Sequence, residues 1–439
     1  MTDDSEPRPV DRRAFLAACG ATALAGCAAG SGDTDGEPAS AAGTATRTET
    51  RTATPADELD LGEPEAWPMA GYDARNTGHN PAANGPTATP TDGWGSDVTG
   101  YKTMSAGAFY DGRLYLGSGE TGYGFDPRDG YPDWTVSLEY SPNFTAPAVA
   151  AADGVTTTYL ATRSTTGAIR GGGDGRLLAV TADGGRRWAR DLPVTGSAKP
   201  VGDRLYVPSS TRETGRLHAL SPTDGTTVWE HTVSGDRTGV FGAPAVANRV
   251  VYAPVTQFDG ETATAELRQL SVDDGTRRRG VTFPGEFRAR PVVDKDGTVY
   301  VTTRSGVVAA VADEVAWETQ VDGEIWATPV LVDEQLVVLA GRRLVAFDTT
   351  TGGRQWTVEL PPTRGSELAT DGETVYVGGN RLTAVAVADG TKRWAEPIPG
   401  GNAGGWGSPV VAGEALFVGV CVKNGENGGL YDDRMRLLV

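Results

Sequence analysis

The sequence predicts an all-β fold that is built from copies of one unit of four antiparallel strands, and two observations carry this prediction. The 439-residue chain contains 60 Gly and 27 Pro, and no stretch with convincing helical periodicity follows the N-terminus. A phrase that ends in Trp recurs at Trp229, Trp356 and Trp394, each time with an Ala ten residues and a Gly four residues before the Trp. A spacing that recurs along a chain indicates one structural unit, copied.

The N-terminus is predicted to be a signal peptide over residues 1–26. Arg12 and Arg13 form a twin-arginine signature, and a run of small and apolar residues follows them. This run is too short for a membrane-spanning helix, which needs about 20 apolar residues. It ends in Leu-Ala-Gly-Cys, the pattern of a lipobox, so Cys27 is predicted to be lipidated and to begin the mature protein. An accidental match in an Ala-rich run is the alternative.

Residues 27–64 have a different composition, dominated by Thr, Ala, Gly, Ser and Glu after the Cys. Leu59 and Leu61 are the large aliphatic side chains of this segment, so it cannot bury enough apolar surface to fold. We therefore expect a disordered stalk that holds a globular domain, residues 65–439, off a membrane. The predicted location is the outer face of the cytoplasmic membrane, with Cys27 as the anchor.

Within residues 65–439 each copied unit divides into four strands. A short innermost strand is often marked by Pro, as in the RPVV that begins at Arg290, and a central strand rich in β-branched and aromatic residues follows, as in TVYV at 298–301. A third strand leads to a tight turn whose Gly tolerates a positive φ. The Trp then lies in the outer strand. Four short antiparallel strands in roughly 40 residues are the pattern of a β-propeller blade.

The number of Trp positions predicts an eight-bladed β-propeller. Seven units are marked by this position, with Arg279 in place of the Trp in the fourth and Trp in the others: Trp134, Trp188, Trp229, Trp317, Trp356 and Trp394. An eighth unit begins after Trp394 and lacks its outer strand, whereas a turn and Trp94 near the N-terminus lack a preceding unit. The strand near Trp94 is therefore expected to complete the last blade and to close the ring. Seven blades with a decorated end are the alternative.

These residues also carry a family resemblance. The Trp phrase resembles the repeat of pyrroloquinoline-quinone-like (PQQ-like) propellers, which include quinoprotein dehydrogenases and BamB-like lipoproteins. The segment EAWPMAGYDARNTGHNP, residues 65–81, resembles the segment that precedes the first blade in archaeal and bacterial members. The resemblance covers about residues 65–439 and implies that the Trp side chains dock neighbouring blades. It implies a fold more than a function.

An enzyme of the quinoprotein class is the less favoured functional hypothesis. The resemblance implies a vicinal Cys–Cys disulfide, acidic and amide ligands to Ca²⁺ and an Asp base for such enzymes, and this chain has no adjacent cysteines. The chain is also shorter than the alcohol dehydrogenases of the family. The DKDG at 294–297 lacks the other ligands of a calcium loop and is expected to be a hairpin turn. No catalytic residue, metal or cofactor is therefore predicted, and PQQ with Ca²⁺ belongs to the alternative, oxidation of an alcohol or sugar.

A set of side chains in one register is the candidate binding site. Five units have an aromatic residue or an arginine three residues before the Pro of the inner strand: Phe144, Phe241, Arg288, Trp326 and Trp406. The start of the innermost strand lies beside the central channel of a propeller, so these side chains could form an aromatic ring with one cation at the channel mouth. Such a ring would bind planar ligands, sugars or peptide side chains. Packing between blades is the alternative.

The charge of the chain narrows the class of partner. It has 57 acidic and 39 basic residues, a formal net charge of -18, which makes nucleic-acid binding improbable because phosphates attract positive surfaces. An acidic surface with few lysines resembles proteins of salt-accumulating archaea, where molar salt shortens the Debye length to about 3 Å. The sequence thus predicts a halophilic, non-catalytic surface lipoprotein that binds or assembles an unknown protein partner or small ligand.

Overall fold

The computed structural model describes residues 66–98, 105–138, 145–162, 175–211, 213–235, 238–240, 242–363, 366–399, 404–424 and 430–439. All of them belong to one compact unit, Arg47–Val439. The predicted signal peptide and stalk lie outside the described residues. Within the described ranges the chain forms strands and turns, without any α-helix, and no helix there could cross a membrane.

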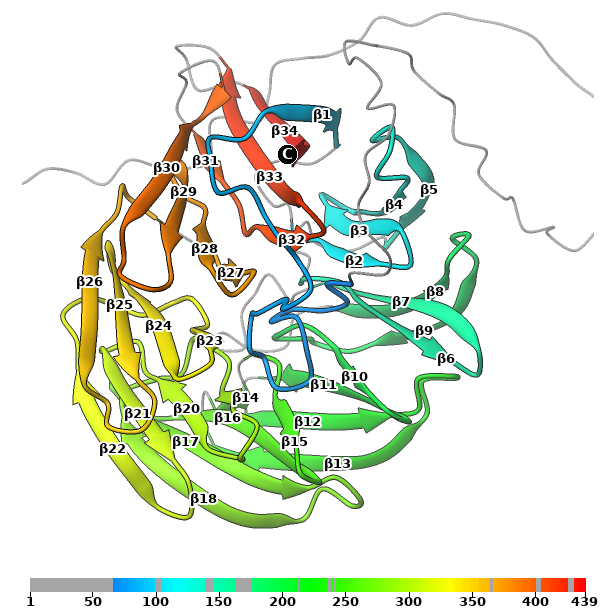
Figure 1. Cartoon of the computed structure of the whole chain (residues 1–439). Coiled ribbons are helices and arrows are strands. Elements are labelled where there is room, and N and C mark those ends of the chain that lie inside the picture. The colour runs from blue at the N-terminus through cyan, green and yellow to red at the C-terminus, as the bar shows by residue number, and fades with distance from the viewer. Residues whose placement is uncertain are drawn as a thin grey trace, which may run out of the picture. The chain divides into compact units, whose positions relative to one another are not determined.

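Eight antiparallel sheets follow one another around a common centre, in chain order (Figure 1). The first four blades have these strands. Blade 1 contains β2 (Ala108–Tyr110), β3 (Arg113–Ser118), β4 (Thr121–Phe125) and β5 (Pro132–Ser137). Blade 2 contains β6 (Ala148–Ala152), β7 (Val155–Ala161), β8 (Arg176–Thr181) and β9 (Arg186–Asp191). Blade 3 contains β10 (Lys199–Val201), β11 (Arg204–Ser210), β12 (Thr214–Leu220) and β13 (Thr227–Ser234). Blade 4 contains β14 (Gly239–Val240), β15 (Ala245–Ala247), β16 (Val250–Asp259), β17 (Thr262–Ser271) and β18 (Arg277–Pro284).

The last four blades repeat this order. Blade 5 contains β19 (Val292–Val293), β20 (Val299–Thr302), β21 (Val307–Val311) and β22 (Val315–Gln320). Blade 6 contains β23 (Val330–Val332), β24 (Gln335–Ala340), β25 (Arg343–Asp348) and β26 (Arg354–Glu359). Blade 7 contains β27 (Leu368–Thr370), β28 (Thr374–Val377), β29 (Arg381–Ala386) and β30 (Lys392–Pro397). Blade 8 contains β31 (Gly404–Trp406), β32 (Val410–Ala412), β33 (Ala415–Asn424), β34 (Leu430–Leu438) and β1 (Asp92–Asp97).

The ring closes as the sequence predicts. The N-terminal strand β1 pairs antiparallel with the C-terminal strand β34, with Asp97 opposite Arg434. Thr91 and Val439 also exchange backbone hydrogen bonds of 2.7 and 3.0 Å. The prediction of eight four-stranded blades is confirmed, and the seven-bladed alternative is not. In blades 4 and 8 a second short strand also pairs with the central strand.

The seven Trp side chains of the repeat join neighbouring blades. Each indole N–H donates a hydrogen bond of 2.6–3.1 Å to a backbone carbonyl beyond its own blade: Trp94 to Pro127, Trp134 to Ala182, Trp188 to Pro222, Trp229 to Val272, Trp317 to Thr349, Trp356 to Val387 and Trp394 to Pro86. In six junctions the indole also packs on the Gly of the next blade's turn, where a Cβ would lie only 2.5–2.8 Å from the ring. The repeated Gly thus serves a positive φ and a close approach.

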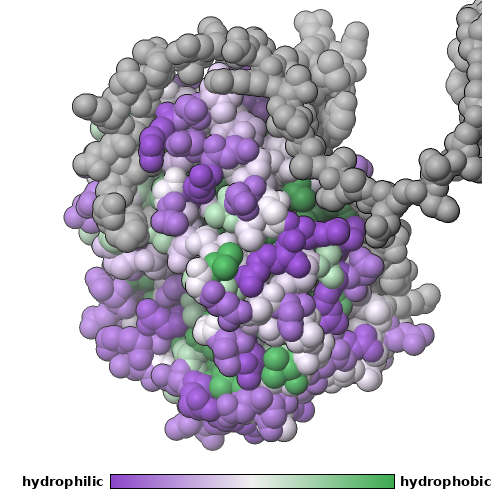
Figure 2. Space-filling model, turned by 90° about the vertical axis from the view of Figure 1, so that its right-hand side faces the viewer, coloured by the Kyte–Doolittle hydropathy of each residue, from purple (hydrophilic) through white to green (hydrophobic). Residues whose placement is uncertain are grey.

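Apolar layers between the blades form the core. One such layer joins Tyr300 and Val308 of blade 5 to Leu336, Val338 and Phe347 of blade 6. Central strands such as β24 are buried on both faces, so their sequences are nearly continuous apolar runs. In outer strands such as β26, exposed and half-buried side chains alternate. On the side where β5, β8 and β9 lie, the visible described residues show single hydrophobic residues scattered among hydrophilic ones (Figure 2).

Candidate functional site

A segment at Trp67–Asn84, which we call the strap, contacts all eight blades in chain order. The strap lies at the centre of the ring (Figure 1). In six blades the backbone N–H at one position of the inner strand donates to a strap carbonyl, at 2.7–3.0 Å: Phe109 to Trp67, Val149 to Pro68, Val246 to Ala74, Val293 to Arg75, Leu331 to Thr77 and Thr370 to Gly78. In blade 8 the Asn80 side chain donates to Val411 O at 3.0 Å. The strap therefore covers the axis at the end where the inner strands finish.

Blade 3 contacts the strap through a lysine side chain. Its residue at the donor position is Pro200, which has no N–H to donate. The preceding residue, Lys199, is fully buried, and its ammonium group donates to Ala70 O at 2.9 Å and to Asp73 O at 2.7 Å. In each blade this position pairs with the equivalent position of the central strand. The other seven blades have Ala or Val there: Ala108, Ala148, Ala245, Val292, Val330, Ala369 and Val410.

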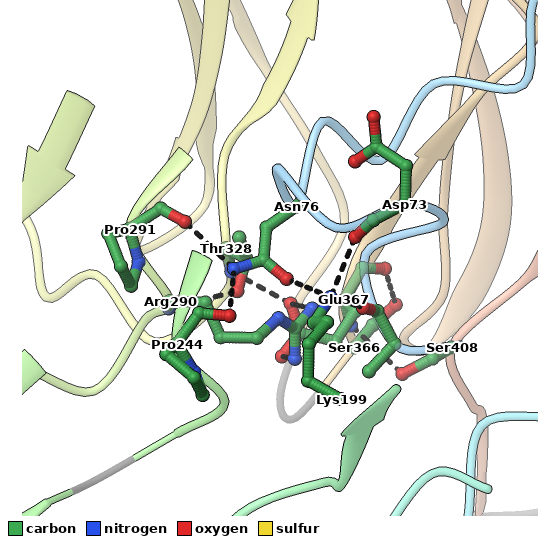
Figure 3. A network of polar contacts seen from close by, with 11 residues as sticks. Asp73, Asn76, Lys199, Pro244, Arg290, Pro291, Thr328, Ser366, Glu367 and Ser408 are labelled. Atoms are coloured by element: carbon green, nitrogen blue, oxygen red, sulfur yellow. Dashed lines mark hydrogen bonds and ion pairs between the residues drawn. The ribbon is translucent and has the colours of Figure 1, made fainter. Parts of the chain in front are cut away.

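The environment of Lys199 changes its acidity. The pKa of Lys199 is lowered to about 7, mainly by burial and also by the nearby Arg290 cation, whereas Asp73 opposes the shift. The third acceptor of the ammonium group is Asn76 Oδ1 at 2.5 Å. Asn76 is itself buried, and its Nδ2 donates to the carbonyls of Pro244 and Pro291 at 3.2 and 2.9 Å (Figure 3). Its φ of 61° is one that Asn adopts more readily than most residues.

A second polar layer on the axis joins blades 5 to 8. It is formed by residues two positions before the small apolar residue of the inner strand: Arg290, Thr328, Glu367 and Ser408. The Arg290 guanidinium contacts both carboxylate oxygens of Glu367 at 3.3 Å. Glu367 also accepts from Thr328 N at 2.8 Å, and Glu367 N donates to Ser408 Oγ at 3.0 Å (Figure 3). These charges are therefore engaged with protein partners, and the arrangement ties four blades together.

The other end of the axis carries Arg288 and Trp326, two residues of the sequence-predicted set. With Glu286, Arg304 and Glu324 they form the mouth cluster. The guanidinium carbons of Arg288 and Arg304 lie 5.4 and 4.7 Å from the centre of the Trp326 ring. Trp326 is 46% exposed. Arg288 stands five residues before Val293, whose N–H binds the strap, so the chain between the two layers spans at most about 17 Å.

The structure corrects the expectation for Trp406. This residue belongs to β31 and is 2% exposed, because it packs in the apolar core at blade 8. Its backbone exchanges two hydrogen bonds of 2.8 and 2.9 Å with Gly379 of blade 7. Trp406 therefore does not line the mouth. Phe144 and Phe241 lie outside the described residues, so the full aromatic ring of the sequence prediction is untested.

Possible metal ligands do not converge among the residues that the structure describes. Hydrogen bonds from nearby residues occupy the Asp294 carboxylate in the turn at 294–297. Asp296 N, Thr298 N and the Tyr300 hydroxyl all donate to it, at 2.9–3.0 Å. This turn borders a groove of about 1290 Å³ between the strap and blades 5 to 7.

Sequence comparison assigns the family. The model described as outer membrane protein assembly factor BamB, of the PQQ-like repeat, matches residues 87–269 and 261–432, which is most of the chain. The chain belongs to this family. The strap of this PQQ-like propeller protein precedes the matched residues. No curated protein sequence matches the chain.

Solved structures agree with the fold. BamB from Moraxella catarrhalis is 17% identical with a TM-score of 0.59, over 80% of this chain and 99% of that one. A europium-containing methanol dehydrogenase is 12% identical with a TM-score of 0.67, over 86% and 99%. The quinohemoprotein alcohol dehydrogenase ADHIIG from Pseudomonas putida HK5 is 14% identical with a TM-score of 0.63, over 87% and 82%. At these identities the similarity concerns the propeller alone.

Sequence reasoning named residues 65–81 and Arg288 but did not predict the contacts of the strap. It also missed these side chains: Lys199, Arg290, Glu367, Glu286, Arg304 and Glu324. One signal was present, because Lys199, Arg290, Thr328 and Ser408 all stand directly before a Pro. Glu367 has no such mark. Glu286 and Arg304 come from different loops, and only the folded chain brings them together.

Proposed function

We propose that this protein is a non-catalytic cell-surface lipoprotein whose propeller serves as a binding or assembly platform for a protein or ligand. One observation carries the proposal: the charged groups on the axis are bound to each other or to the strap, whereas the mouth cluster exposes Trp326 and charged side chains. Exposed Trp and Arg are the residue types that dominate binding energy at interfaces. The name of the BamB family, an assembly factor, agrees with a platform role.

The alternative is a PQQ-dependent dehydrogenase of an alcohol or sugar, the activity in the names of the two similar dehydrogenases. The described residues do not fit a calcium–quinone centre. Glu367, the carboxylate of the second axial layer, is bound to Arg290 and Thr328, and three or more potential metal ligands do not meet anywhere in the described ranges. This poor fit supports the platform, and we derive no catalytic step.

Titration separates the two functions directly. Purified protein is titrated with PQQ and Ca²⁺ together, and dye-linked oxidation of alcohols and sugars is assayed. The platform predicts neither saturable quinone binding nor dye reduction. Stoichiometric binding accompanied by turnover would replace the platform with the dehydrogenase.

Partner capture tests the platform itself. Full-length protein is purified from membranes in high salt, beside a variant with Trp326→Ala and Arg288→Ala at the mouth cluster. We expect a bound partner that the wild type retains and the double variant loses. An equal yield of the same partner from both proteins would place the binding surface elsewhere.

The lipid anchor belongs to the same proposal. The lipobox and the twin-arginine signature support export and attachment to the outer face of the cytoplasmic membrane through Cys27. A Cys27→Ala variant is expected in the medium, measured by immunoblot of cell and medium fractions. Retention of this variant in the membrane would contradict lipid anchoring.

A further inference from the structure

A cavity of about 600 Å³ adjoins the mouth cluster at the junction of blades 4 and 5. Four charged residues of the cluster line it, beside Phe258, Glu261 and Ser305: Glu286, Arg288, Arg304 and Glu324. At this same junction the Trp of the repeat is replaced by Arg279, and the facing turn at 312–314 lacks a Gly. A cavity of this size holds a small ligand or one unit of a larger one.

The cavity offers no unpaired positive charge to an anionic ligand. Glu286 is buried and accepts from both arginines, with Arg288 and Arg304 at 2.7 and 2.8 Å. Arg304 also donates twice to Glu324, at 2.8 and 3.1 Å. Two cations are thus matched by two carboxylates, and the exposed Glu261 adds a third carboxylate to the lining. An anionic ligand would have to break these pairs and leave a charge without its partner, which is strongly unfavourable.

The same groups retain hydrogen-bonding capacity for a neutral ligand. A guanidinium group has five N–H donors, and the bonds of Arg304 to the two glutamates use three of them. A carboxylate has about four acceptor positions, and Glu324 uses Oε2 once, for Trp326 Nε1 at 3.0 Å. Both donors and acceptors therefore remain on the wall. Because the ion pairs hold these side chains in place, little side-chain entropy remains to be lost on binding.

Trp326 stands beside this wall, and the guanidinium groups of Arg288 and Arg304 lie over its ring. Its indole is fixed by the bond to Glu324 and remains 46% exposed. A ligand that suits the whole site has hydroxyl groups that donate and accept, and a C–H face that packs on an aromatic ring. Pyranose sugars combine both properties. We propose that the cavity and Trp326 bind a neutral sugar unit of a carbohydrate; this inference rests on the proposed function, which makes the mouth the binding end.

Sugar titration tests this inference separately from partner capture. Glucose, galactose, mannose, N-acetylglucosamine and their linear trisaccharides are titrated into the full chain in high salt, with calorimetry and Trp fluorescence as readouts. At least one neutral sugar is expected to bind. Trp326→Ala should weaken that binding about tenfold, which is 1.4 kcal/mol. Val315→Ala, at another exposed apolar residue, is the control and should bind like the wild type.

Three outcomes would overturn the sugar assignment. Glucuronate that binds more tightly than the neutral sugars would show that the site prefers an anion. Equal sugar binding by Trp326→Ala and the wild type would show that the sugar site lies elsewhere. Capture of a protein through Trp326, with no sugar of the panel bound, would assign the cavity to that protein and leave the platform proposal intact.

Discussion

Lys199 replaces a backbone donor that the sequence removes. Pro200 interrupts the series of inner-strand N–H groups that hold the strap, and the neighbouring ammonium group supplies the missing hydrogen bonds from a different direction. A buried cation is costly, and its three acceptors reduce that cost. The position is therefore a point where the stability of the ring depends on pH.

The pH dependence has a definite sign. The folded-state pKa of Lys199 is lowered to about 7, so between pH 7 and about 10 the unfolded chain holds a proton that the folded chain has released. Stability should therefore rise with pH across this window, by up to about 1.4 kcal/mol per pH unit. In Lys199→Met this contribution should vanish, as measured by denaturant unfolding at several pH values. Lys392→Met, at an exposed lysine, is the control. Identical slopes for Lys199→Met and the wild type would contradict the prediction.

Single residues also show where sequence reasoning ends. Arg288 and Trp326 could be identified from the sequence because each stands three residues before the Pro of its inner strand. Trp406 has the same spacing, yet an extra strand, β31, takes its side chain into the core. A register predicts which residues are equivalent along the strands. It does not predict local departures from the repeat, nor ion pairs such as Glu286 with Arg304 between different loops.

Among the structural elements, the junction between blades is the repeating device. Six junctions combine an outer-strand Trp with the Gly of a turn in the next blade, so the Trp and the Gly that recur in the sequence contact each other across blades rather than within one. For this reason the sequence predicts the blade count and the closing strand well. The strap has no repeat and binds mainly through its backbone carbonyls, so its sequence carries little sign of its eight contacts.

The junction can be tested at its glycine. Gly390 has a φ of +74°, and a Cβ there would lie 2.6 Å from the Trp356 ring. Gly390→Ala should therefore destabilise the fold by about 1–3 kcal/mol through overpacking, in addition to backbone strain. Gly202→Ala is the matched control, because Gly202 has a φ of +59° and nothing within 4 Å of its Cβ position. Equal losses in thermal or denaturant unfolding would mean that strain alone acts at both sites.

The junction between blades 4 and 5, where an Arg replaces the Trp, should respond differently to mutation. Arg279 stands in the register of the Trp, 4.0 Å from Asp313, and both side chains are substantially exposed. Exposed pairs of this kind contribute little to stability. Arg279→Ala should leave the unfolding midpoint nearly unchanged, whereas Trp229→Ala, one blade earlier, should lower the stability by about 3–5 kcal/mol. A large loss in Arg279→Ala would show that this junction also depends on its outer strand.

The whole molecule carries a formal charge of -18, which opposes a compact state through self-repulsion. As the salt concentration rises, the distance over which these charges repel one another becomes shorter. Thermal unfolding should therefore occur at a higher temperature in molar KCl than in dilute buffer. Sucrose at equal osmolality controls for general solute effects. A midpoint that does not respond to KCl would contradict the halophilic interpretation.

The pairing of β1 with β34 also determines when the ring can first exist. During synthesis β1 leaves the ribosome long before β34, so it has no partner strand until β34 appears. The strap waits in the same way for blade 8, which supplies its contact with Asn80. The propeller is therefore completed only after β34 has left the ribosome. An export route for folded proteins, as Arg12 and Arg13 predict, would carry it across the membrane with its first and last strands already joined.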